Sequence, residues 1–206
     1  MSGLLQAGFG TVAELKGRIT PASMATYDTD TEWDTDLIQI GIAVAEEFNS
    51  RCNRIFQRGA GAVYETTGGG SSFALDRYPI ESVTSLVKTG KGTSETLTSQ
   101  IYQLHGKTGI VEMDGQVGWH KDKVAITYDG GYWLNDGGSL PSGATELPTE
   151  ILNAWVMQCQ AQVTHLGTLY EAGVTNDEAK ISLLRELELL PAVRAILAPY
   201  KRFTGI

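Results

Sequence analysis

The spacing of apolar residues changes twice along this chain, and this change limits the possible folds more than any other feature. Between Asp36 and Cys52 apolar residues recur at intervals of three and four, which places them on one face of a helix. They are Leu37, Ile40, Gly41, Val44, Ala45 and Phe48. Helical spacing returns after Pro148 and continues to Gly173, through Leu152, Trp155, Cys159, Val163, Leu166 and Tyr170. The pattern predicts helices on both sides of a central segment of another kind.

The central segment, from about Ala62 to Trp133, has the composition of β-strands. Val, Ile, Thr and Tyr are frequent in it, and Gly clusters interrupt it at short intervals. These stretches predict antiparallel strands and hairpins. We interpret Gly68–Gly70 as a flexible hairpin tip. A phosphate-binding loop is the alternative, but it would need a following Lys-Ser or Lys-Thr pair and a helix.

The sequence therefore predicts an α+β fold, in which N- and C-terminal helices form a helical bundle and an antiparallel β-rich region is inserted between them. The expected divisions are 1–58 for an N-terminal arm and helix, 59–134 for the β-rich insertion, and 135–206 for a loop, C-terminal helices and a tail. The predicted helical core consists of Leu37, Val44, Phe48, Leu152, Trp155, Cys159, Leu166, Leu184 and Leu187.

The acidic run "DTDTEWDTD", residues 28 to 36, precedes the first strongly periodic helix. We interpret it as the start of that helix, with Thr31 and Asp34 resembling a capping box and the acids stabilised by the helix dipole. A calcium-binding loop is the alternative. That template fails because Trp33 stands where the loop needs Gly and Gln39 where it needs a bidentate Glu. No metal site is expected.

Catalytic patterns do not stand out in the sequence. The histidines His105, His120 and His165 lie in separate segments without metal-ligand spacing. Cys52 and Cys159 fall within apolar helical patterns, which is typical of buried free thiols. We expect a protein that is not an enzyme and needs no cofactor, although a triad assembled by the fold from distant residues remains an alternative.

Charge and hydropathy limit the partners of the chain. Its 16 basic and 24 acidic residues give a net charge of −8, which disfavours a DNA-binding surface over the whole molecule. No apolar stretch is long enough for a membrane helix, so no membrane partner is expected. Trp119, Trp133 and Trp155 could stack on nucleic-acid bases, but no basic stretch interleaves them. Packing in a core or in a subunit interface is favoured for all three.

Three short motifs, in their order along the chain, resemble a known family. They are Arg77-Tyr78-Pro79-Ile80, Thr127-Tyr128-Asp129-Gly130-Gly131-Tyr132 and Pro199-Tyr200-Lys201-Arg202-Phe203. Together with the helix–strand–helix order, they make residues 20 to 206 similar to the head-to-tail connector, or adaptor, proteins of tailed phages and gene transfer agents. The triple glycine and the loop "NDGGSLPSGATEL" exceed what a minimal connector needs.

The resemblance implies a structural virion protein of the neck, made in the host cytoplasm and located between capsid and tail. About twelve copies would form a ring beneath the portal protein and contact one another, the portal and a downstream neck or tail protein. DNA would pass through the ring without sequence-specific binding, and an acidic channel wall would let it slide. Another neck component, a stopper or tail terminator, is the alternative, and a small hydrolase or carbohydrate-binding module is a third hypothesis.

The tail "YKRFTGI" is the candidate docking element for the portal. Pro191 and Pro199 interrupt helix propagation before it, and it carries two cations and two aromatic rings. Aromatic and Arg side chains commonly anchor protein interfaces. The hypothesis is that the portal contacts are made by Tyr200, Lys201, Arg202 and Phe203. A frayed terminus is the alternative.

Overall fold

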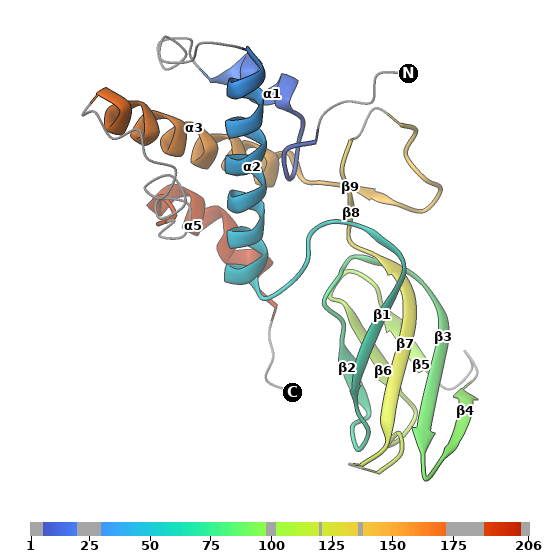
Figure 1. Cartoon of the computed structure of the whole chain (residues 1–206). Coiled ribbons are helices and arrows are strands. Elements are labelled where there is room, and N and C mark those ends of the chain that lie inside the picture. Colours follow the sequence, from blue (N-terminus) through green and yellow to red (C-terminus); the bar gives the residue numbers. More distant parts are fainter. Residues whose placement is uncertain are drawn as a thin grey trace. The chain divides into compact units, whose positions relative to one another are not determined.

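A computed structural model describes residues 6–19, 30–97, 102–119, 121–135, 138–171 and 188–202. The chain divides into two compact units, which we call the helical unit and the β unit (Figure 1). The helical unit comprises Met1–Cys52, Leu134–Ser139 and Leu147–Lys201, and the β unit comprises Asn53–Trp133, Leu140–Glu146 and Arg202–Ile206. Helices and mainly antiparallel sheets occur together, so the predicted α+β class is confirmed.

The helical unit contains helices from both ends of the chain. Its elements are α1 (Val12–Arg18), α2 (Asp30–Cys52), α3 (Thr149–Glu171), α5 (Pro191–Leu197) and the short 3-10 helix η3 (Ala198–Tyr200). α3 crosses α2 and packs against it, and α5 packs against α3 (Figure 1). Within the described ranges, no helix combines the length and apolar character needed to span a bilayer.

The apolar stripe of α2 faces the core of the helical unit, as its spacing predicts. All six of its predicted members are buried. Of the predicted helical core, Leu37, Val44, Phe48, Trp155 and Cys159 are fully buried. Leu152 is half-buried, while the side chain of Leu166 and residues Leu184 and Leu187 lie outside the described residues, as do His120 and Asp28.

The close contacts made at Gly41 explain why a glycine occupies one position of this apolar stripe. The indole N–H of Trp155 donates a hydrogen bond to the Gly41 carbonyl oxygen over 2.9 Å. A Cβ atom at Gly41 would collide with the carbonyl of Ala7 and would lie 3.0 Å from the Trp155 ring. The absence of a side chain therefore lets the N-terminal segment and α3 both pack directly against the backbone of α2.

The start of α2 differs from the prediction. The helix begins at Asp30, so Thr31 lies inside it and the predicted capping box of Thr31 and Asp34 is wrong. Asp34 instead forms an ion pair of 2.5 Å with Lys16, in the last turn of α1. A capping box does occur at α1, where Thr11 and Glu14 each accept the other's backbone N–H. A continuous helix from Asp30 onward is also not the backbone that a calcium loop requires.

Two antiparallel sheets of the β unit surround one core. The four-stranded antiparallel sheet has the order β1 (Gly59–Thr67), β7 (Lys123–Gly130), β3 (Ile80–Gly90) and β4 (Thr93–Leu97). The three-stranded sheet has the order β2 (Ser72–Ala74), β6 (Ile110–Met113) and β5 (Tyr102–His105). The apolar core takes side chains from both sheets, among them Phe73 and Val111 from one and Ile126 and Tyr128 from the other.

The triple glycine does not form the predicted hairpin tip. β1 pairs with β7 and β2 pairs with β6, so Gly68–Gly70 connects two different sheets. Its backbone is tied to the segment 117–122: the Gly68 N–H donates to the Asp122 carbonyl, and the Gly69 N–H to the Val117 carbonyl. The loop "NDGGSLPSGATEL" also holds a strand that the sequence did not predict, β9 (Thr145–Glu146), which pairs in parallel with β8 (Tyr132–Trp133).

A buried arginine lies where the chain passes from α2 into the β unit. After α2 ends at Cys52, Asn53 adopts a left-handed conformation that is common just beyond a helix C-terminus. Arg54 follows and is only 3% exposed. Its guanidinium carbon lies 3.4 Å from the ring centroid of Tyr78 and 4.6 Å from that of Phe56, and it donates a hydrogen bond to the Tyr78 carbonyl. Cation–π attraction and this bond offset the loss of hydration.

Replacing Arg54 should destabilise the β unit. Arg54→Ala removes the cation–π contacts, leaves the Tyr78 carbonyl without this donor and opens a cavity, at a cost of about 3 kcal/mol. Urea denaturation followed by circular dichroism measures the change. The control is Arg51→Ala at the exposed end of α2, which should leave the midpoint unchanged. Equal midpoints for the two variants would contradict this role of Arg54.

Candidate functional site

The described residues do not support a metal or thiol site. Among them, no three His, Cys, Asp or Glu side chains gather closely enough to hold an ion. His105 lies 3.2 Å from Glu112 on the neighbouring strand, and His165 is exposed on α3. Cys52 and Cys159 are buried and free, as predicted. Burial raises the pKa of the Cys159 thiol, so the thiol stays protonated and unreactive near neutral pH.

Two of the three motifs that resemble the connector family, residues 77–80 and 127–132, meet in the β unit. The Tyr128 hydroxyl donates to the Asp76 carboxylate over 2.5 Å and accepts the backbone N–H of Arg77 over 3.1 Å. The backbone N–H of Gly131 donates to the Pro79 carbonyl over 2.9 Å. Residues about fifty positions apart thus form one hydrogen-bonded cluster.

The segment that follows α2 completes this cluster. The backbone N–H of Ile55 donates to the Asp76 carbonyl, and the Arg77 guanidinium donates to the Gln57 carbonyl over 2.6 Å. Gly131 has a φ of 95°, and a Cβ there would lie 2.7 Å from the Gln57 oxygen, so glycine is required at this close approach. The two motifs hold the β unit together, and their described contacts are structural.

Tyr128 should make the stability of the β unit sensitive to alkaline pH. Burial and the nearby Asp76 raise the pKa of Tyr128 above its usual value of about 10. The unfolded chain then loses the phenolic proton first, so this contribution to stability is present below about pH 10 and declines as pH rises further. Tyr128→Phe should lower stability by about 1 to 2 kcal/mol at pH 7 and flatten the decline above pH 10.

Urea midpoints measured between pH 7 and 11 test this prediction. Tyr102→Phe, at a half-buried tyrosine of β5, is the matched control and should keep the wild-type pH profile. An unchanged alkaline decline in Tyr128→Phe would show that other groups cause it.

The predicted docking residues near the C-terminus have partners within the chain. The Tyr200 hydroxyl donates to the Glu150 carboxylate at the start of α3. The Arg202 guanidinium donates to the Ala74 carbonyl over 2.5 Å, and its carbon lies 5.7 Å from the ring centroid of Tyr64. Lys201 is exposed, and Phe203 lies outside the described residues. Sequence reasoning did not find these internal contacts, because each partner is at least 50 residues away.

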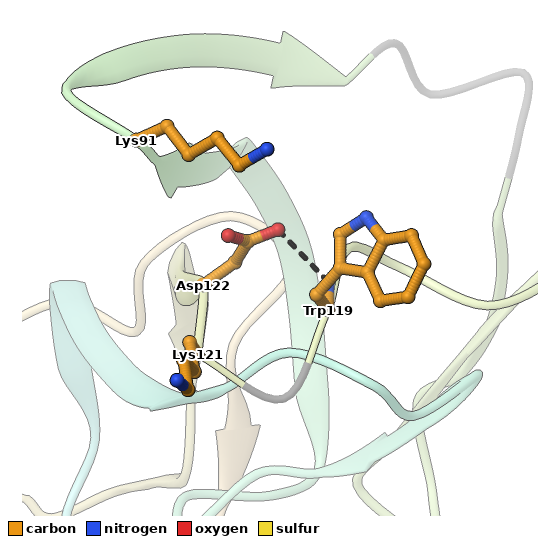
Figure 2. A pocket seen from close by; sticks show the side chains of 4 residues that line it. All are labelled: Lys91, Trp119, Lys121 and Asp122. Atoms are coloured by element: carbon orange, nitrogen blue, oxygen red, sulfur yellow. Dashed lines mark hydrogen bonds between the residues drawn. The ribbon is translucent and has the colours of Figure 1, made fainter.

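A second candidate site lies in the β unit and was not predicted from the sequence. An open cavity of about 520 Å³ is lined by Lys91, Trp119, Lys121 and Asp122 (Figure 2). Trp119 is 79% exposed, so of the two predicted positions, a core or a subunit interface, the core does not apply to this residue, whereas Trp155 is fully buried in a core. The available signal was the position of Trp119 in an aperiodic segment next to Gly118.

The comparisons with known proteins identify a fold. The sequence matches no protein-family model, and a comparison with curated proteins gives no significant match. The structure resembles a chain described as "Neck of empty GTA particle computed with C6 symmetry", where GTA is gene transfer agent, and one described as "Virion of native gene transfer agent (GTA) particle". Both have a TM-score of 0.57 and 15% identity, and the similarity covers 100% of this chain and 96% and 98% of the other two.

Proposed function

We propose that this protein is a structural component of the neck of a tailed-phage-like or gene transfer agent particle. Within the neck it acts as the head-to-tail adaptor, a ring beneath the portal that extends the DNA channel and joins capsid to tail. The observation that carries the proposal is the shared fold, which spans this whole chain and 96% of a chain in a gene transfer agent neck. The similarity therefore includes both the helical unit and the β unit.

The positions of the two motifs that resemble the connector family support this proposal. The contacts of Tyr128, Arg77 and Gly131 hold the β unit together, so the motifs encode an architecture. An adaptor works through such an architecture and requires no catalytic step or cofactor. The six-fold symmetry used for the similar neck is compatible with rings of six or twelve copies, and we propose twelve. DNA would pass through the ring without sequence-specific contacts.

The C-terminal residues Tyr200, Lys201, Arg202 and Phe203 form the proposed portal contact. The bonds of Tyr200 to Glu150 and of Arg202 to Ala74 hold the backbone on both sides of Lys201. The Lys201 side chain remains exposed and can reach a carboxylate on the portal. Deleting residues 199–206 would also remove these internal bonds, so a substitution of Lys201 is the cleaner test.

The molar mass of the protein, alone and with the portal of the same particle, tests the proposed function. We expect light scattering to show a multimeric ring on the portal, because the portal would present repeated docking sites in a circle. A protein that binds the tail-side neck protein but not the portal would identify a stopper or tail terminator instead. A protein that binds neither would contradict the neck assignment.

Lys201→Glu tests the docking residues separately. Reversing this charge should weaken portal binding about tenfold, because an attractive contact becomes a repulsive one. Lys107→Glu, in the exposed turn between β5 and β6, makes the same change in net charge and is the control. Equal affinities of the two variants in a titration with portal would exclude Lys201 from the contact and leave the ring assignment standing.

A further inference from the structure

Trp119 is the most exposed large apolar side chain of the described residues, at 79%. Its indole lies at the cavity lined by Lys91, Lys121 and Asp122 (Figure 2). A large aromatic surface in contact with water is unfavourable, and aromatic anchors of this kind carry much of the binding energy in protein interfaces. The position of Trp119 therefore indicates an interaction surface.

The backbone holds Trp119 in place before any partner binds. The Asp122 carboxylate accepts the backbone N–H of Trp119 over 2.8 Å, and the backbone N–H of Asp122 donates to the Trp119 carbonyl over 2.9 Å. Behind this turn, a Cβ at Gly68 would lie 2.6 Å from the Trp119 carbonyl, and one at Gly90 would collide with the Asp122 carboxylate. Close packing against two glycines fixes the turn, which lowers the entropy lost when Trp119 binds a partner.

Lys91 lies beside this turn in an unusual backbone conformation. It occupies the turn between β3 and β4 with a φ of +47°, a region that favours Gly or Asn. The turn itself requires this conformation, because Gly90 pairs with Thr93 and a two-residue hairpin needs positive φ at both central residues, Lys91 and Gly92. The Lys91 side chain extends toward Trp119 and lines the cavity together with Lys121 and Asp122 (Figure 2).

The charge of the cavity indicates a partner that carries carboxylates. The Asp122 carboxylate is engaged by the turn, while Lys91 and Lys121 are exposed, on a chain whose net charge is −8. Duplex DNA is the less suitable partner, because two lysines neutralise few phosphates and the rest of the chain repels them. A protein surface with an apolar recess and a few carboxylates matches both the indole and the lysines.

We propose that this cavity docks a second copy of the same chain. The Trp119 indole packs against an apolar patch of the next copy, and Lys91 and Lys121 pair with its surface acids. Two such cavities facing one another would repel, so the contact joins different surfaces head to tail, which is the interface type that closes rings. The inference rests on the proposed adaptor function, because the ring is the assembly in which the contact would operate.

Two variants test the contact in the full chain, both on the portal and in solution at rising protein concentration. Trp119→Ala and the double variant Lys91→Glu, Lys121→Glu should each raise the concentration needed for assembly about tenfold or more. Leu140→Ala, at another exposed apolar residue, and Lys107→Glu are the controls and should assemble as wild type. Thermal midpoints equal to wild type show that the variants are folded. Assembly should also weaken as salt is added.

A photoreactive residue at position 119 identifies the partner directly. Benzoylphenylalanine there should cross-link one copy to another within the ring. A cross-link to DNA or to a different neck protein would overturn the inference and assign the cavity to that molecule. If the wild-type chain forms rings and the variants assemble equally well, this contact is overturned while the ring assignment stands. A wild-type chain that forms no multimer, with or without portal, would overturn the ring and this contact together.

Discussion

The β unit depends on the burial of one cation. Arg54 is two residues beyond the end of α2 and almost fully buried, so its charge must be stabilised by groups that the fold supplies. The ring of Tyr78 and the Tyr78 carbonyl supply most of this, and both belong to a segment more than 20 residues away. The burial of Arg54 therefore favours the arrangement that brings Tyr78 against the segment that follows α2. The bonds of Ile55, Arg77 and Gly131 fix the same arrangement.

In the helical unit, a buried side chain without charge also depends on a distant backbone carbonyl. Trp155 is fully buried and needs a hydrogen-bond acceptor for its indole N–H, and the backbone carbonyl of Gly41 provides one. Because Gly41 has no side chain, the N-terminal segment approaches the same point of α2. Each unit thus has a large side chain whose polar group is satisfied by a distant backbone carbonyl. Such contacts specify one packing arrangement, which suits a protein whose proposed function depends on shape.

Trp119 and Trp155 show why some features followed from the sequence and others did not. Trp155 belongs to a run of apolar residues at helical spacing, and this pattern correctly predicted its burial. Trp119 lies in an aperiodic segment, where residue type alone left a core and a subunit interface open, and the structure rules out the core. Its surroundings come from the turn between β3 and β4 and from the triple glycine, which sequence reasoning had interpreted as a hairpin tip. Composition does not indicate which turn lies beside which loop.

The sequence by itself determined the α+β class, the extents of the long helices to within one turn or two, the buried face of α2 and the free thiols. These features depend on the spacing of neighbouring residues, and periodicity is a local property. Only the tertiary structure decided that β1 and β2 join different sheets, that Asp34 pairs with Lys16, and that Arg202 binds the Ala74 carbonyl. The tertiary structure also placed Lys91 beside Trp119. These pairings depend on contacts between segments far apart in the chain, and local spacing carries no information about them.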